Sequence, residues 1–225
     1  MVETMIADPE RALALSYAPR GARAGLAALW ALDETLGAIL RTTREPLVGQ
    51  MRLTWWHSAL CALDTAPPPA QPVLQALAAE VLPRGVSGAA LAGMIDGWEI
   101  LLEPDPLTDA ALEAFATARG ATLFESAGVV LGAAAGDPLA EAGRGWALAD
   151  LALHSRDALA GARPRALATG ALVAATKARW SVSARALGAL AHGARMTLAV
   201  APGEAVRPGA PGRVARLAFH RLTGR

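Results

Sequence analysis

Apolar residues recur at helical spacing along most of the chain. Between about residues 20 and 43 they repeat every three or four positions, which predicts a core helix. The repeating residues are Leu26, Leu29, Trp30, Leu36 and Leu40. Glu45-Pro46 ends the pattern, because the residue before a proline avoids helical backbone angles and proline fits a first helical turn. The next helix is predicted over residues 47–63.

Turn residues divide the rest of the chain into further helices. Ser87 and Thr108 are predicted N-caps, whereas the segment 161–165 (GARPR) is predicted to break helical structure. The predicted helices cover about residues 72–82, 87–103, 108–131 and 139–159, followed by two segments up to about residue 200 with a break near 179–183. Neither strand-like alternation nor an internal repeat is found, so the fold class predicted is an all-α bundle.

The pattern predicts one helical domain over residues 1–200 and a tail over residues 201–225. In the tail, a Pro- and Gly-rich loop precedes a short basic amphipathic helix. Its arginines and apolar residues are Arg213, Arg216, Arg221, Arg225, Leu217, Phe219 and Leu222. Two interpretations remain open: this helix binds an anionic membrane surface, or it docks on the bundle.

Composition narrows the range of partners and compartments. The 225 residues are 53% hydrophobic with a net charge of +1, which gives no reason to expect a nucleic-acid partner. No apolar run reaches the roughly 18 to 20 residues that span a membrane, and the N-terminus lacks the pattern of a secretory signal. Cys61 is the one cysteine, which fits a reducing compartment. We therefore expect a cytoplasmic protein that is soluble or peripheral at a membrane.

Isolated reactive side chains do not indicate an active site by themselves. Cys61 has no nucleophile motif around it, and we expect a small core residue. His57 has no nearby sequence feature that would orient it, and a surface or packing role is favoured. The four histidines lack the spacing of zinc ligands, which argues against a zinc enzyme.

Three blocks resemble the squalene/phytoene synthase superfamily in order, spacing and residue type. They are residues 25–60, which include REPLVGQMRLTWWHSAL at 44–60, residues 115–132 (FATARGATLFESAGVVLG) and residues 145–167 (GWALADLALHSRDALAGARPRAL). The resemblance implies an isoprenoid-synthase-type helical bundle with roughly eight to ten helices around a central apolar cavity.

The resemblance also implies a chemistry. Members of the superfamily condense two prenyl diphosphates head to head, and magnesium ions bridge the diphosphate oxygens to protein carboxylates. Two Asp-x-x-x-Asp-like pairs supply these carboxylates, since a spacing of four places both on one helical face. If the chain is such an enzyme, Mg²⁺ is the expected cofactor; otherwise no cofactor is expected.

The first acidic motif of the superfamily is lost in this sequence. Gly37, Ala38 and Arg41 occupy the positions where its acidic residues belong. Asp33 and Glu34 lie one helical turn earlier. They supply the acidic residues of the motif only if the alignment to the superfamily is shifted.

The second motif is half preserved. Arg156-Asp157 matches the Arg-Asp pair of the superfamily, but Gly161 takes the place of the second aspartate, so Asp157 is the one residual metal-ligand candidate. Replacement ligands are conceivable among Asp96, Glu99 and Glu103, although a solvated face is the favoured interpretation of these three residues.

The sequence of residues 44–60 is more similar to a synthase-like branch of the superfamily than to the synthases themselves. This branch is associated with assembly of respiratory complex I. That branch has a Gly-x-x-Arg-x-x-Trp-Trp type helix. The resemblance implies a retained bundle without established prenyl transfer, and respiratory-complex assembly partners.

Arg52 and the tryptophan pair are the candidate cavity residues of this helix. Arg52 is either an anion contact inherited from a diphosphate site or a structural arginine paired with Glu34 or Asp157, and the structural role is favoured. Trp55 and Trp56 point about 100° apart, so one is expected in the core and the other in a groove or against a neighbouring helix. The helix is expected to line the former synthase cavity.

The sequence supports three functional hypotheses. The first is a synthase-like protein, a pseudoenzyme without full transferase activity, that acts as an assembly or interaction factor near the inner membrane. The second is an active prenyltransferase of isoprenoid biosynthesis, and the third is a protein that binds an isoprenoid or lipid in the cavity. The candidate cavity or motif residues are Asp33, Glu34, Arg52, Trp55, Trp56, Arg156 and Asp157.

Overall fold

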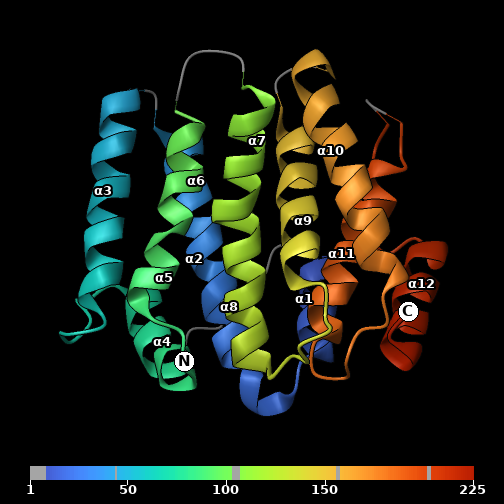
Figure 1. The fold of residues 1–225 in the computed structure, drawn as a ribbon, viewed down its shortest axis with the longest axis horizontal. Coiled ribbons are helices and arrows are strands. Elements are labelled where there is room, and N and C mark those ends of the chain that lie inside the picture. Colours follow the sequence, from blue (N-terminus) through green and yellow to red (C-terminus); the bar gives the residue numbers. More distant parts are fainter. Residues whose placement is uncertain (1–8, 44, 103–106, 156–157, 202–203) are drawn as a thin grey trace.

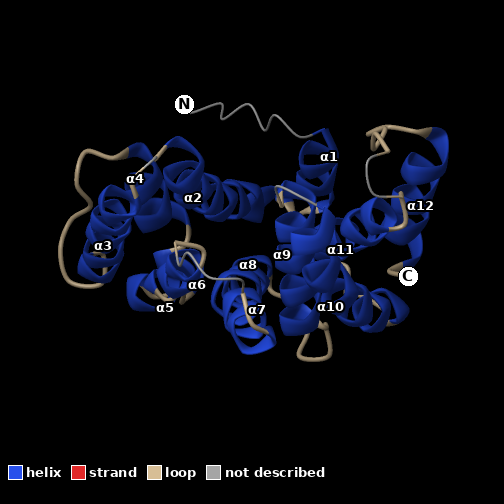
Figure 2. Ribbon diagram, turned by 90° about the horizontal axis from the view of Figure 1, so that it is seen from above, coloured by secondary structure: helices blue, strands red, loops and turns tan. Residues whose placement is uncertain are grey.

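The computed structural model describes residues 9–43, 45–102, 107–155, 158–201 and 204–225. Within these ranges every regular element is a helix (Figures 1 and 2), and no strand is formed. The prediction of an all-α bundle is confirmed.

The helices run side by side across a broad bundle (Figure 1). They are α1 (Pro9–Tyr17), η1 (Arg20–Ala22), α2 (Arg23–Thr42), α3 (Pro46–Ala62), α4 (Pro72–Glu80), η2 (Leu82–Arg84), α5 (Gly88–Ala92), α6 (Met94–Ile100), α7 (Asp109–Phe115), η3 (Ala116–Ala121), α8 (Thr122–Leu131), α9 (Leu139–His154), α10 (Ala158–Lys177), α11 (Arg185–Leu198) and α12 (Pro211–Thr223). Figure 1 shows α3 at one edge, α12 at the opposite edge and α9 between them. Helix α1 is an element that the sequence pattern does not predict.

The predicted N-caps are confirmed. The side chain of Ser87 accepts a hydrogen bond from the backbone N–H of Ala90, and that of Thr108 accepts one from Ala111. The single helix expected from Ser87 onward is wrong, because the chain forms the two short helices α5 and α6 with Gly93 between them. Glycine favours this interruption through its low helix propensity.

The predicted break at residues 161–165 is also wrong. Helix α10 continues through this segment with Pro164 inside it, although proline costs a helix interior about 3 kcal/mol. Ala168, Leu172 and Ala175 of the same helix are fully buried. Packing along this face offsets the local penalty.

A π-helical segment, η3, joins α7 to α8 in one continuous rod. Short π-helical turns are rare and often lie at functional sites. Gly120 of η3 touches α9 so closely that a Cβ atom there would lie 2.1 Å from the carbonyl oxygen of Gly143, and Gly97 lets α6 approach the backbone of Arg119. These glycines bring η3 against α6 and α9.

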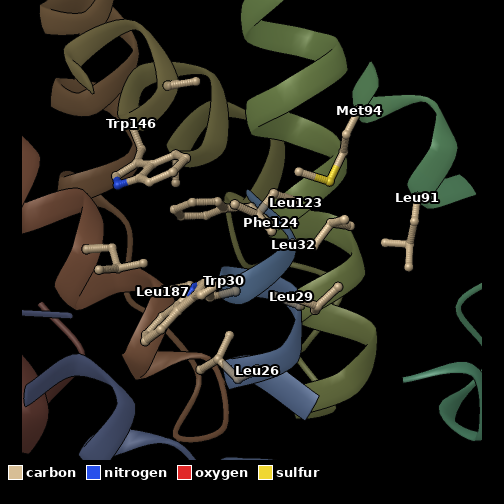
Figure 3. Close-up of a cluster of buried hydrophobic side chains, with 14 of the residues drawn as sticks. Leu26, Leu29, Trp30, Leu32, Leu91, Met94, Leu123, Phe124, Trp146 and Leu187 are labelled. Carbon is tan, nitrogen blue, oxygen red and sulfur yellow. The ribbon is translucent and has the colours of Figure 1, made fainter. Parts of the chain in front are cut away.

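The region between the helices is densely filled. Figure 3 shows side chains from several elements meeting around Phe124, whose ring lies 5.8 Å from that of Trp146. The labelled residues are Leu26, Leu29, Trp30, Leu32, Leu91, Met94, Leu123, Phe124, Trp146 and Leu187. All of them are buried. This packing fixes the positions of α2, α6, η3 and α9, which carry the polar cluster described next.

Candidate functional site

Arg119 of η3 is buried at the centre of the bundle and binds Asp33 of α2 through two hydrogen bonds. Its Nε donates to Asp33 Oδ1 over 2.8 Å, and its Nη2 donates to Asp33 Oδ2 over 3.0 Å. The two side chains are 3% and 2% exposed. Parallel, charge-assisted bonds of this kind are among the strongest in proteins.

The same guanidinium also reaches α9. Its Nη1 donates to Asp150 Oδ2 over 2.7 Å. Asp150 in turn lies 3.3 Å from Nδ1 of the exposed His154, one helical turn further along α9. Arg119 therefore joins the carboxylates of two different helices, and a protonated His154 completes a cluster with two positive and two negative charges.

Aromatic rings enclose the guanidinium. Arg119 Cζ lies 4.2 Å from the ring centroid of Trp98, 4.8 Å from that of Trp146 and 5.7 Å from that of Phe115. Cation–π contacts of this kind are strongest when the cation is desolvated. The rings exclude water from the ion pair and hold the arginine in place.

The ionisation of the cluster follows from these contacts. Burial disfavours the charged form of Arg119, but the carboxylates of Asp33 and Asp150 outweigh it and raise the pKa of Arg119. Burial alone would raise the pKa of Asp150, but Arg119 and His154 hold this pKa below its ordinary value. The hydrogen bond to Asp150 raises the pKa of His154. All of these shifts favour the charged forms.

Near Asp33, close packing surrounds Gly37, one of the positions that the resemblance aligns with the first acidic motif. Asp33, Gly37 and Arg41 are spaced by four and so share one face of α2. A Cβ atom at Gly37 would lie 3.0 Å from Arg41 Nη1 and 3.0 Å from the Trp98 ring. Arg41 forms an ion pair with the exposed Glu34. A side chain at position 37 would therefore require Arg41 or Trp98 to shift.

The described residues do not fit the magnesium site of a synthase. The carboxylate of Asp33 is fully engaged by Arg119, and that of Asp150 is shared between Arg119 and His154. In the ranges that the structure describes, no three His, Cys, Asp or Glu side chains are grouped so that they could hold a metal ion. Arg156 and Asp157, predicted as the residual second motif, lie outside the described residues.

The candidate residues of α3 do not join this cluster. Arg52 is exposed and donates to Thr43 Oγ1 over 3.0 Å, while Glu34 pairs with Arg41. The predicted ion pair between Arg52 and Glu34 is therefore wrong, and the alternative partner Asp157 is outside the described residues. Helix α3 lies at the edge of the bundle (Figure 1), so Arg52 is far from the central cluster, and the expectation that this helix lines the former synthase cavity stays a prediction.

The tryptophan pair divides as its helical spacing predicts. Trp56 is in the core and is 6% exposed. Trp55 is 49% exposed and lies edge-on to Trp56, with ring centroids 5.4 Å apart.

Asp96 is exposed and Glu99 is half-buried, whereas Glu103, the third member of the predicted trio, is outside the described residues.

A small pocket lies beside the central cluster. It has a volume of about 110 Å³ and opens between α1, α9 and α11, with Trp146 and Asp150 in its wall. Pockets for drug-sized ligands usually hold about 300–1,000 Å³. The pocket is therefore small for a prenyl chain.

The two residues that complete the cluster, Arg119 and Asp150, were not predicted from the sequence. Each is a single charged residue in a stretch of small or apolar residues, ATARGATLF and WALADLAL. Because a buried charge needs a partner of opposite sign, lone charges on apolar helices are a signal that could have suggested the pairing. The choice of partners depends on tertiary structure.

Both interpretations of the C-terminal helix agree with its placement. On one side of α12, Leu217 and His220 are buried, and Arg213 forms an ion pair with Glu10 of α1. On the other side, Val214, Phe219 and Leu222 are exposed. Across the part of the chain that the structure covers, no helix is both long and apolar enough to cross a bilayer.

Comparisons with known proteins agree with this architecture. Among solved structures, the chain is similar to a dehydrosqualene synthase crystallised in complex with a ligand, with a TM-score of 0.72 and 14% sequence identity. The match covers 95% of this chain and 90% of that structure. At this identity the likeness shows the fold, and the predicted isoprenoid-synthase-type bundle is confirmed. Comparison with curated proteins gives no match.

A family model supplies the identity that the structural likeness alone does not. The model described as squalene/phytoene synthase matches residues 6–157, more than half of the chain. This range contains Asp33, Arg119 and Asp150. The chain belongs to the squalene/phytoene synthase family.

Proposed function

We propose that this chain is a synthase-like protein without full prenyltransferase activity, which acts as an assembly or interaction factor at the cytoplasmic face of the inner membrane. The observation that carries the proposal is the bridge that Arg119 forms between Asp33 and Asp150. In a synthase, carboxylates on opposing helices hold magnesium and diphosphate. Here an arginine of the chain itself lies between carboxylates of two different helices, Asp33 of α2 and Asp150 of α9.

The energetics of this bridge favour a structural role. A magnesium ion would have to displace a guanidinium that is held by three hydrogen bonds and enclosed by Trp98 and Trp146. Removing one partner of such a buried pair typically costs about 3–5 kcal/mol. A diphosphate brought near Asp33 without cations would also meet like charge. Both effects oppose the chemistry of the family at this place.

The runner-up is an active prenyltransferase of isoprenoid biosynthesis. Family membership supports it, and so does the structural neighbour, which was crystallised with a ligand. Under this hypothesis Asp157 and a shifted Asp33/Glu34 pair hold Mg²⁺. The engagement of Asp33 by Arg119 and of Glu34 by Arg41 argues against that ligand set.

The third hypothesis, an isoprenoid or lipid carrier, has less support. A carrier needs an apolar space for the tail of its ligand. The filled region around Phe124 (Figure 3) and the volume of about 110 Å³ of the pocket beside Asp150 leave little room for such a tail at these two places.

Helix α12 supports a location at the membrane surface. Its exposed apolar residues Val214, Phe219 and Leu222 lie among arginines, and residues 205–225 contain no Asp or Glu. Such a helix is attracted to anionic lipid. The proposed partners at this surface are proteins of respiratory-complex assembly, as the resemblance of residues 44–60 implies.

A turnover assay tests the loss of activity. Purified protein is incubated with farnesyl diphosphate and Mg²⁺, and diphosphate release is measured alongside the Asp157→Ala variant. We expect no release above background for either protein. Turnover at about 1 s⁻¹ or faster, which is ordinary for an enzyme, would overturn the proposal. If Asp157→Ala also abolished that turnover, the runner-up would be established.

A further inference from the structure

Helix α3 presents an apolar stripe to solvent. Leu47, Met51 and Trp55 are spaced by four and therefore share one face of the helix, and they are 69%, 66% and 49% exposed. Val48 beside them is 42% exposed. We call these four residues the α3 stripe. Contiguous exposed apolar surfaces on soluble proteins often mark interaction sites.

The stripe is not the face that holds α3 on the bundle. A separate set of residues, Gly49, Leu53, Trp56 and Leu60, is buried against the neighbouring helices. The buried Trp56 also touches Trp55 edge-on. Trp55 is thus held in place before any partner arrives, which lowers the entropic cost of using it in an interface.

A groove extends from the stripe toward α6. It has a volume of about 590 Å³, and its wall includes the apolar residues Leu47, Ile100 and Leu102. Asp96 and Glu99 of α6 also line it. The stripe and the groove share Leu47, so they form one continuous surface with an apolar side and an acidic side.

The residue types of this surface resemble those of protein interfaces. Tryptophan and methionine are enriched in interface cores, and a few large residues usually dominate the binding energy. Met51 and Trp55 are of these types. An apolar stripe with a four-residue period matches the i, i+4 side chains of an amphipathic helix that packs in a groove.

The charge of the groove narrows the chemistry of the partner that it can bind. Neither Asp96 nor Glu99 has an ion pair with any residue that the structure describes. Two carboxylates beside the stripe repel an anionic membrane surface. They also disfavour a symmetric contact with a second copy, because this would bring like charges together. A basic partner matches the groove.

We propose that the α3 stripe and its groove bind an amphipathic helix of a partner protein, with apolar residues four apart and Lys or Arg on the adjoining face. The apolar residues pack on Met51 and Trp55, and the basic residues pair with Asp96 and Glu99. This inference rests on the proposed interaction function and names the chemistry of its partner.

The test uses two synthetic 15-residue helical peptides and the full-length protein. Both peptides carry Leu at positions four apart, and they differ only in having Lys or Glu on the adjoining face. Binding of the labelled peptides is measured by fluorescence anisotropy at low salt and at 0.5 M salt. We expect saturable binding of the Lys peptide, at least tenfold weaker binding of the Glu peptide, and weaker binding of the Lys peptide at high salt.

Variants locate the binding site. Met51→Asp should weaken binding of the Lys peptide at least tenfold, and the double variant Asp96→Asn, Glu99→Gln should remove most of its salt dependence. Val182→Asp is the matched control, because Val182 is an equally exposed apolar residue outside α3 (70% exposed). Circular dichroism checks that each variant is folded.

Several outcomes would overturn the inference. These are no saturable binding of the Lys peptide, equal binding of both peptides, and an equal effect of Met51→Asp and Val182→Asp. Self-association of the wild-type protein that Met51→Asp abolishes would assign the stripe to a second copy instead. Loss of binding to phosphatidylglycerol vesicles in Met51→Asp would assign it to lipid. The turnover assay is independent, so a failed peptide test and a failed pseudoenzyme proposal are distinguishable.

Discussion

Arg119 lies at the centre of the bundle and Arg52 lies at its edge, although both belong to segments that resemble the synthases. Arg119 is 3% exposed, binds two carboxylates and contacts the faces of two tryptophans. Arg52 is exposed and bonds to threonine hydroxyls. The difference shows that an arginine in this chain is a structural centre where it is buried between two carboxylates, and a surface residue where its helix lies at the edge of the bundle.

The largest effect on the free energy of unfolding is expected when Arg119 is replaced, with a replacement of Arg52 as the comparison. Arg119→Leu leaves the carboxylates of Asp33 and Asp150 without their cation in the core, which should lower the free energy of unfolding by about 3–5 kcal/mol. Arg52→Leu is the matched control and should change it by less than about 0.5 kcal/mol. Denaturant unfolding of both variants measures the difference. Equal effects would mean that Arg119 is not the structural centre.

The second prediction concerns Gly37, which shares the face of α2 that carries Asp33. Gly37→Asp adds a carboxylate at a position that the resemblance aligns with the family's first acidic motif, and its Cβ atom would lie 3.0 Å from Arg41 Nη1 and from the Trp98 ring, so these side chains must shift. Overpacking of this kind typically costs about 1–3 kcal/mol. Gly170→Asp is the control, because Gly170 is exposed on α10 with no atom within 4 Å of a Cβ there. Thermal unfolding of the two variants compares the costs, and a Gly37→Asp protein as stable as Gly170→Asp would show that the site still has room.

Much of the fold could be predicted from the sequence because its helices carry regular apolar periodicity and their caps are local signals. The N-caps at Ser87 and Thr108 depend on neighbouring residues only. The continuation of α10 through Pro164 depends on packing against other helices, which one sequence does not reveal. Tertiary packing overrides local propensity there.

The candidate site was predicted only in part. Asp33 was a candidate, and it does lie at the centre of the bundle. Arg119 is 86 positions from Asp33 in the sequence, and Asp150 is 31 positions from Arg119. Pairing over such separations depends on the fold. Arg52 and Trp55 were candidates because of family resemblance, and the exposure of α3 makes them surface residues instead.

The third prediction tests the charge balance of the centre through pH. His154 has a raised pKa in the folded protein, so its contribution to stability is fully present below the unfolded value of about 6.5 and is lost as pH rises through the folded pKa. His154→Gln should therefore reduce stability by about 0.5 kcal/mol at pH 5 and have little effect at pH 9. A difference between wild type and variant that does not change with pH would contradict the assigned ion pair.

The pH dependence of stability must be compared between wild type and His154→Gln, because two other histidines change the stability with pH in the opposite direction. Burial is the main cause that lowers the pKa of His192 to about 3 and that of His220 to about 4. Their contribution is present above about pH 6.5 and is lost as the pH falls toward these folded values. The difference between wild type and His154→Gln removes this background, since both proteins share it.

The smallest effect on stability is expected at the edge. Met51→Asp should change the free energy of unfolding by no more than about 0.5 kcal/mol, because the side chain is 66% exposed. The same variant is expected to lose at least tenfold in binding of the Lys peptide. Urea unfolding of the purified variant provides the stability value, and a loss above about 2 kcal/mol would mean that Met51 belongs to the packed part of α3.

The central proposal is that the bridge from Arg119 to Asp33 and Asp150 leaves this chain without the magnesium-dependent diphosphate site of a synthase. Isothermal titration with a non-hydrolysable farnesyl diphosphate analogue, with and without Mg²⁺, tests it most directly. We expect no magnesium-dependent binding. Magnesium-dependent binding at a single saturable site would contradict it, because carboxylates must then be free to rebuild the metal clamp.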